Sequence, residues 1–200
     1  MRQIFVKRFD TLPFVSGEIY RYMNSKVGDP MTDALVDSCL DEIKDKFDLS
    51  VVWGEFDVSV IDGVVSFEDF KLESRNLAEM LNGCSTSIIF VATSGFEIDR
   101  AIKKYTQISP SRALALSAIG SERIETLCNT FCKELKGKYG ELTPRFSPGY
   151  GDLPLSTQEC IFSHLNASKN IGVTLNNSLL MSPSKSVTAI IGIKNNKLGL

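Results

Sequence analysis

The chain has 200 residues, of which 43% are hydrophobic and 23% are charged, and its formal net charge is −2. This length suits one large domain or two small ones, and the composition is ordinary for a soluble globular protein. A net charge of −2 does not favour binding to nucleic acid. No apolar run approaches the roughly 18 residues of a membrane span, and residues 1–10 do not have the pattern of a secretion signal. We therefore expect a cytoplasmic protein with no nucleic-acid or membrane partner.

The first half of the chain reads as helices around a hairpin. The first fifty residues are predicted to be helical, with Asp29 as the N-cap of an amphipathic helix and Pro30 at its first position. Residues 49–72 alternate in short runs around Asp62-Gly63, which predicts a β-hairpin. SRNLAEMLNG then predicts a short helix that ends at Gly83.

A buried strand and long helices are expected next. STSIIFVAT is a continuous apolar run, so we expect a central strand covered on both faces. FEIDRAIKKY and the long segment from SPSRALALS to KGKYG are predicted helices, with Gly120 as a break or a close-packing point. Cys128 and Cys132 are four residues apart on the long helix, and we interpret them as packing residues, because two thiols alone make a poor zinc site. The odd total of five cysteines indicates a reduced, cytosolic chain.

The C-terminal part mixes a loop, a helix and short strands. ELTPRFSPGYGDLP has too many prolines and glycines for a regular element. STQECIFSHL restarts a helix, in which Ser156 and Glu159 fit a capping box. IGVTL, SLLM and SVTAIIGI are predicted strands. This mixed order predicts an α+β fold, namely a single domain over residues 1–200 with a mixed, mainly antiparallel twisted sheet flanked by helices.

No conventional active site is visible in the sequence. His164 is the single histidine, so a histidine-rich metal site or a Ser-His-Asp triad would depend on one residue, and we interpret it as an ordinary helical histidine. The chain has no phosphate-binding loop and no dinucleotide fingerprint. The acidic run DEIKDKFD is most simply the solvated face of a helix.

Residues 145–150, RFSPGY, combine an arginine, a Pro-Gly turn and a tyrosine. Ser147 to Tyr150 fit a type II turn, because proline and glycine suit its second and third positions. A guanidinium binds a carboxylate through two parallel hydrogen bonds, and an aromatic ring can face a cation. The stretch therefore suits a ligand with a carboxylate, a positive centre and a purine, although a plain surface turn is the simpler interpretation of a common sequence.

RFSPGY also resembles the R-x-x-x-G-Y signature of the activation domain of cobalamin-dependent methionine synthase. Three further stretches resemble that family in the same order. FVATSGFEIDRAIKKY is similar to its strand ending in A-T-x-G before an E-I-D helix, ALALSAIGSERIE to its helix with A-I-G-S, and IGVTLNNSLLMSPSKSVTAIIGI to its closing segment. The resemblance runs from about the hairpin to the end of the chain and is more diffuse over the first fifty residues.

The resemblance implies that the chain binds S-adenosylmethionine and supports reductive remethylation of cobalamin that has reached the inactive cob(II) state. It implies that Arg145 holds the ligand carboxylate, that the backbone from Ser147 to Gly149 contacts the ligand, and that Tyr150 lies beside the methyl group or the corrin face. These are expectations carried from the family onto matching positions of this sequence.

Two further contacts and several departures follow from the same resemblance. Ile191 and Gly192 match the strand that touches the ligand, and DTLPF places Asp10 in the family's D-x-x-P-F context. The homocysteine, folate and cobalamin modules of the full synthase do not fit into this chain, and the D-x-H-x-x-G pattern of the cobalamin ligand is absent. ATSGFE has a serine where the family has a leucine.

Three functions are therefore open. The first is a free-standing reactivation subunit of a cobalamin-dependent methyltransferase, as in a split methionine synthase of methionine biosynthesis, with cobalamin on a partner corrinoid protein and a flavodoxin-like reductant as electron donor. The second is a non-enzymatic interaction module for a corrinoid protein that has lost S-adenosylmethionine binding. The third is a general small-molecule binding protein with the same fold.

Overall fold

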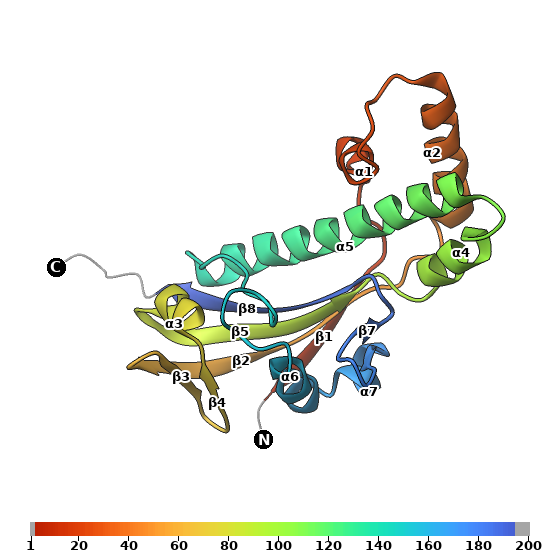
Figure 1. The fold of residues 1–200 in the computed structure, drawn as a ribbon. Coiled ribbons are helices and arrows are strands. Elements are labelled where there is room, and N and C mark those ends of the chain that lie inside the picture. Colours follow the sequence, from red (N-terminus) through yellow and green to blue (C-terminus); the bar gives the residue numbers. More distant parts are fainter. Residues whose placement is uncertain (1–2, 195–200) are drawn as a thin grey trace.

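A twisted sheet of six strands runs through the protein, and the computed structural model describes residues 3–194 (Figure 1). Its order is β4-β3-β2-β5-β8, and β1 pairs with the first half of the long strand β2. All of the pairings between described strands are antiparallel, so the predicted α+β fold with a mainly antiparallel sheet is confirmed. The strands are β1 (Ile4–Phe9), β2 (Leu49–Ile61), β3 (Val64–Phe67), β4 (Lys71–Glu73), β5 (Cys84–Thr93) and β8 (Ser186–Lys194).

The first fifty residues are less helical than the sequence indicated. Their first element is β1, and the helices α1 (Ser16–Tyr22) and α2 (Pro30–Ile43) follow it. The strand forms because its alternate residues turn to the α5 side of the sheet, where Phe5 stacks on Trp53 at 5.3 Å between ring centroids. The start of α2 is as predicted, since the side chain of Asp29 accepts a hydrogen bond from the backbone N–H of Thr32 at 2.9 Å.

The predicted hairpin and central strand are both present. Asp62 and Gly63 have φ values of 51° and 79° and join β2 to β3, as a two-residue hairpin turn requires. Strand β5 lies between β2 and β8 and is buried from Ser87 to Thr93. Its side chains alternate between two hydrophobic clusters, one on each face of the sheet.

Helices cover both faces of this sheet (Figure 1). The second half of α5 packs on one face through Ile124, Leu127 and Phe131. The shorter helices α3, α6 and α7 pack on the other face. The helices that follow α2 are α3 (Arg75–Leu81), α4 (Glu97–Tyr105), α5 (Pro110–Tyr139), α6 (Thr157–Leu165) and α7 (Ala167–Ile171). The 30 residues of α5 make it about 45 Å long.

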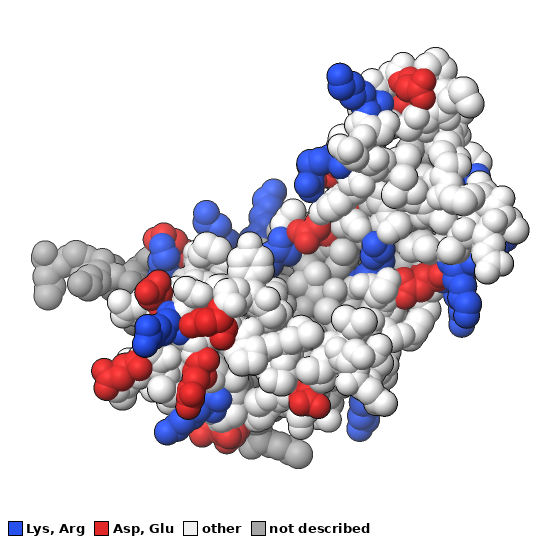
Figure 2. All heavy atoms as spheres, in the orientation of Figure 1, with Lys and Arg blue, Asp and Glu red and all other residues white. Residues whose placement is uncertain are grey.

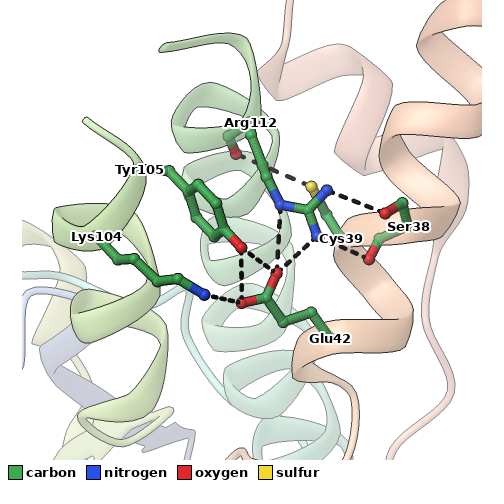
Figure 3. Close-up of polar contacts among 6 residues, drawn as sticks. All are labelled: Ser38, Cys39, Glu42, Lys104, Tyr105 and Arg112. Carbon is green, nitrogen blue, oxygen red and sulfur yellow. Dashed lines mark hydrogen bonds and ion pairs between the residues drawn. The ribbon is translucent and has the colours of Figure 1, made fainter. Parts of the chain in front are cut away.

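The first half of α5 belongs to a separate layer, a helical arm formed with α1, α2 and α4 (Figure 1). A polar network joins three of these helices (Figure 3). Glu42 of α2 accepts hydrogen bonds from Arg112 of α5 at 2.6 Å and from the hydroxyl of Tyr105 of α4 at 3.0 Å, and it forms an ion pair with Lys104 at 3.2 Å. The network therefore holds α2, α4 and α5 to one another within the arm.

Between its two halves, α5 carries a buried ion pair. The side chains of Glu122 and Arg123 are 0% and 2% exposed, and their charged atoms approach to 2.6 Å. Arg123 also donates to the backbone oxygens of Leu12 and Pro13, both at 2.8 Å, and Glu122 accepts from the backbone N–H of Val15 at 3.0 Å. The pair therefore satisfies the backbone of the segment that leads from β1 into the arm.

The C-terminal elements differ in detail from expectation. Ser156 precedes α6, but its side chain makes no capping hydrogen bond, so the predicted capping box is wrong. Its φ of −59° and ψ of −18° are already helical, whereas a side-chain cap needs an extended residue. Helix α7 was not predicted and includes Ile171, so IGVTL contributes only β6 (Thr174–Leu175), which pairs with β7 (Met181–Ser182) in a separate sheet.

Gly120 allows close packing and does not break α5. A Cβ atom at this position would lie 2.8 Å from Cγ1 of Ile98 and 3.0 Å from Cγ of Lys185. Gly137 lies in the same helix, and a Cβ atom added there would have no neighbouring atom within 4 Å. The two glycines thus differ in surroundings while sharing one helix.

We expect Gly120→Ala and Gly137→Ala to have opposite effects on the free energy of unfolding. Alanine at 137 should stabilise the protein by about 1 kcal/mol, because it favours the helix. Alanine at 120 gains the same term but forces Ile98 and Lys185 apart, which should destabilise the protein by about 1–2 kcal/mol overall. Urea unfolding of both variants measures the two signs, and an equal gain in both would contradict the close contact at Gly120.

Glu42 should make the arm sensitive to acid. The hydrogen bond from Arg112, opposed by partial burial, lowers the pKa of Glu42 to about 2. Because this pKa lies below that of an unfolded glutamate, the ion pair stabilises the fold above about pH 4.5 and its contribution is lost as the pH falls towards 2. Glu42→Gln should therefore lower the free energy of unfolding by about 1–2 kcal/mol at about pH 6, allowing for solvent screening, and by much less at about pH 2.5.

Urea titrations at the two pH values test this, with Glu18→Gln as the matched control. Glu18 pairs with Arg21 at the surface, where ion pairs contribute little, so its removal should change stability only slightly at either pH. The same loss in Glu42→Gln at both pH values would contradict the assignment.

Candidate ligand-binding site

The RFSPGY stretch forms the turn that the sequence predicts. The backbone N–H of Tyr150 donates to the oxygen of Ser147 at 3.1 Å, and Gly149 has a φ of 85°, as the third position of a type II turn requires. The N–H of Gly149 is used within the loop, because it donates to the oxygen of Leu153 at 2.8 Å. The turn is therefore rigid, and one of its amides is already occupied.

Asp152 anchors this loop to the start of α3. Its carboxylate accepts hydrogen bonds from the hydroxyl of Ser74 and from the backbone N–H groups of Arg75 at 2.7 Å and Asn76 at 3.3 Å. These groups begin α3, so the carboxylate also neutralises the positive end of that helix. The pKa of Asp152 is lowered, chiefly by the hydrogen bond from Ser74. No local pattern in GYGDLP indicates this contact, because its partners lie more than 70 residues away.

Arg145 points from the loop towards α5. Its Nη2 atom donates to Glu125 at 2.8 Å and to Asn129 at 3.2 Å, and the side chain is 26% exposed. It lines a cavity of about 430 Å³, which we call the Arg145 cavity. The other lining residues are Asn129, Cys132, Lys133, Lys136, Leu142, Thr143, Pro144 and Ile191. The cavity thus combines three cationic side chains with an apolar wall.

The thiols of Cys128 and Cys132, close to Arg145, both have raised pKa values. Burial raises the pKa of the Cys128 thiol to about 12, and it also raises the pKa of the Cys132 thiol. The nearby cation of Arg145 opposes the shift in both residues without reversing it. Both thiols stay protonated near neutral pH, which agrees with their interpretation as packing residues.

The next residues of the loop line a different cavity. Ser147 and Pro148 form one wall of a cavity of about 520 Å³, which we call the Thr188 cavity. Its remaining lining comes from α6 and the residues before it, from the β6–β7 hairpin and the loop after it, and from the start of β8. These residues are Leu155, Gln158, Asn176, Leu179, Leu180, Met181, Ser184, Ser186, Val187 and Thr188. The RFSPGY loop therefore contributes to two cavities.

The other expected site residues are spread out. Ile191 lines the Arg145 cavity, whereas Gly192 is buried, and its backbone exchanges hydrogen bonds with Thr143. Tyr150 is 72% exposed and packs edge-on against Phe146, outside both cavities. Asp10 lines a third cavity of about 390 Å³ at the end of β1, beside the buried Arg123. Ile191 and Arg145 thus line one cavity, Ser147 lines the Thr188 cavity, and Asp10 lines a third.

Two of the sequence motifs have a structural role. Asp99, of the E-I-D stretch, accepts hydrogen bonds from the backbone N–H and the hydroxyl of Ser184, both at 2.6 Å, and so ties α4 to the loop before β8. Lys185 lays its stem over Gly120 and donates to Ser117 and Ser121 on α5. These contacts link the motifs to each other and position β8 beside α5.

Charged side chains are unevenly distributed over the face that Figure 2 shows. Lysine, arginine, aspartate and glutamate gather around α3, β3 and β4, whereas the middle of this face, over α6, is mostly uncharged (Figures 1 and 2). Within residues 3–194, no helix has the length and apolar character needed to cross a membrane.

Comparison with known proteins gives a match in structure only. No family model matches the sequence, and no curated protein matches it. Among solved structures, the MetH reactivation domain bound to AdoHcy superimposes with a TM-score of 0.72, over 100% of this chain and 81% of that one, at 13% sequence identity. The chain has the fold of the MetH reactivation domain. This agrees with the resemblance to methionine synthase activation domains that the four sequence stretches indicated.

Loss of the Asp152 anchor should loosen the loop between the two cavities. In Asp152→Ala, the amides of Arg75 and Asn76 lose their acceptor, and we expect faster hydrogen exchange there and over residues 147–153. Exchange measured by mass spectrometry tests this, with Asp57→Ala as a control at an exposed position of β2. Unchanged protection in the loop would show that other contacts hold it.

Proposed function

We propose that this protein binds S-adenosylmethionine and supports reductive remethylation of cobalamin on a partner corrinoid protein. The main support is that its whole described length takes the fold of a domain solved with AdoHcy, the compound that remains when S-adenosylmethionine has given up its methyl group. The R-x-x-x-G-Y turn, which suggested the same ligand from sequence, lies between two cavities of the size that small molecules occupy.

Arg145 is the residue that we expect to hold the ligand carboxylate. It lies in a cavity of about 430 Å³, and its hydrogen bonds to Glu125 and Asn129 both leave from Nη2. Both bidentate edges of a guanidinium include Nη2, so a ligand carboxylate would take the place of Glu125 or Asn129 at that atom and add a bond from Nε or Nη1. Lys133 and Lys136 line the same cavity and add to its attraction for an anion.

The chemistry asked of this chain is positioning. One electron from a flavodoxin-like reductant would return the partner's cobalamin from the cob(II) to the cob(I) state, and that cobalamin would then accept the methyl group, so that a cobalt–carbon bond replaces the carbon–sulfur bond and AdoHcy remains. No general acid or base is needed, and the chain's residues bind the ligand and orient its sulfonium. The expected partners are a corrinoid protein or a methionine synthase subunit and the reductant.

One observation favours the alternative, an interaction module that has lost S-adenosylmethionine binding. The guanidinium of Arg145 already has a carboxylate partner in Glu125, 2.8 Å away, so a ligand carboxylate must share or displace it. In that case the fold would serve recognition of a corrinoid protein alone. Glu125→Gln tests this competition: ligand binding that appears only in the variant would show that Glu125 blocks the site in the wild-type chain.

Calorimetric titration with S-adenosylmethionine tests the proposal. We expect binding to the wild-type chain and about 10- to 100-fold weaker binding to Arg145→Ala, since a charge-assisted contact is lost. Arg145→Lys should recover only part of the affinity, because it keeps the charge without the planar fork.

Arg100→Ala is the matched control. Arg100 is an exposed arginine of α4 that pairs with Glu97, so its removal should leave the affinity unchanged. No heat with the wild-type chain and with Glu125→Gln would remove the ligand-binding function, and equal affinity in Arg145→Ala would show that Arg145 is not the carboxylate site. Recovery of a cobalamin-binding protein in a pull-down would then favour the interaction module.

A further inference from the structure

The outer hydrogen-bond ladder of β8 stops before the strand does. Ile190 exchanges both backbone hydrogen bonds with Phe146, at 2.8 and 2.9 Å, and Gly192 accepts one from Thr143 at 2.9 Å. Backbone groups alternate in direction along an antiparallel strand, so Thr188 turns its N–H and C=O to this same outer side, away from β5. Within residues 3–194, no backbone or side-chain group donates to or accepts from either of them.

The loop sequence explains why the ladder stops. After Phe146 the chain turns away from β8 at Ser147, and the next residue, Pro148, has no N–H to donate. Thr188 is only 3% exposed, and buried backbone groups without a partner are rare in proteins. Because Thr188 lines the cavity that Ser147 and Pro148 also line, the unused groups face a space that a ligand can enter.

Gln158 adds a second set of polar groups to this space. The side chain is 4% exposed, its Nε2 donates to the oxygen of Leu179 at 3.0 Å, and its Oε1 accepts from the hydroxyl of Thr188 at 3.4 Å. An amide has two donor hydrogens and two acceptor lone pairs, so each end has capacity for one more bond. None of the residues lining the Thr188 cavity is charged, so an ionised group would find no partner there.

We propose that the Thr188 cavity binds an uncharged planar group that carries a hydrogen-bond acceptor next to a donor. The N–H of Thr188 would donate to the acceptor and its C=O would accept from the donor, as Ile190 does with Phe146. A carboxamide and the amino edge of adenine both have this chemistry. The choice of ligands rests on the proposed function, since S-adenosylmethionine supplies the adenine and the partner's cobalamin supplies carboxamides.

NMR of the ¹⁵N-labelled chain tests this through the Thr188 amide itself. Adenosine should shift that amide resonance, and N6,N6-dimethyladenosine, which lacks the donor, should bind at least about tenfold more weakly. A shift with cyanocobalamin and none with adenosine would assign the cavity to a corrin carboxamide. If neither compound at millimolar concentration shifts Thr188, or if both nucleosides bind equally, the proposal is wrong.

Two variants control the measurement. Leu155→Trp should fill the cavity mouth and abolish the shift, whereas Leu114→Trp changes another exposed leucine, on the arm, and should leave the shift intact. Arg145→Ala separates this proposal from the proposed function. If adenosine still shifts the Thr188 resonance in Arg145→Ala, ligand binding in the Thr188 cavity is supported even when S-adenosylmethionine binding fails. If S-adenosylmethionine binding depends on Arg145 but does not shift the Thr188 resonance, only the proposal for the Thr188 cavity is wrong.

Discussion

The buried ion pair of Glu122 and Arg123 is the interaction on which the arrangement of the two layers depends. Two opposite charges lie at the middle of α5, where the helix leaves the sheet and enters the arm, and both are nearly inaccessible to water. Removal of one partner from such a pair leaves an uncompensated charge, which in proteins costs about 3–5 kcal/mol. Here the pair also forms hydrogen bonds with the backbone of residues 12–15, and the Arg123 guanidinium stacks 3.6 Å from the ring centre of Phe14. The crossing from β1 to the arm is therefore specified by charge and not by apolar packing alone.

The candidate site depends on this arrangement indirectly, through the position of α5. α5 presents Glu125 and Asn129 about one and two turns beyond the ion pair, and these side chains hold Arg145 against the helix. On the opposite side of the RFSPGY loop, Asp152 holds the chain to α3. The loop is thus tied at both ends while its turn divides two cavities of different character, one cationic and one uncharged. An anionic group would be favoured in the first cavity and an uncharged ring in the second.

Much of this fold is readable from local signals. The Asp29 cap, the Asp62-Gly63 hairpin and the apolar run of β5 each depend on residues close in sequence, and each is present as predicted. The missed elements depend on distant partners: β1 is a strand because Phe5 meets Trp53, and Ser156 fails as a cap because its own backbone is helical. The same limit applies to the site. The turn was predictable from Pro148 and Gly149, whereas the Glu125 partner of Arg145 and the open ladder at Thr188 follow only from how the loop crosses β8.

The position of β8 in the sheet has a consequence for how the protein is made. The strand comprises residues 186–194, yet it lies beside the central strand β5 and buries Ala189, Ile190 and Ile191. During synthesis on the ribosome, β5 emerges about a hundred residues earlier and must wait with one edge unpaired. An apolar strand with an open edge is a template for misassembly, so the nascent chain is most vulnerable to aggregation during that interval.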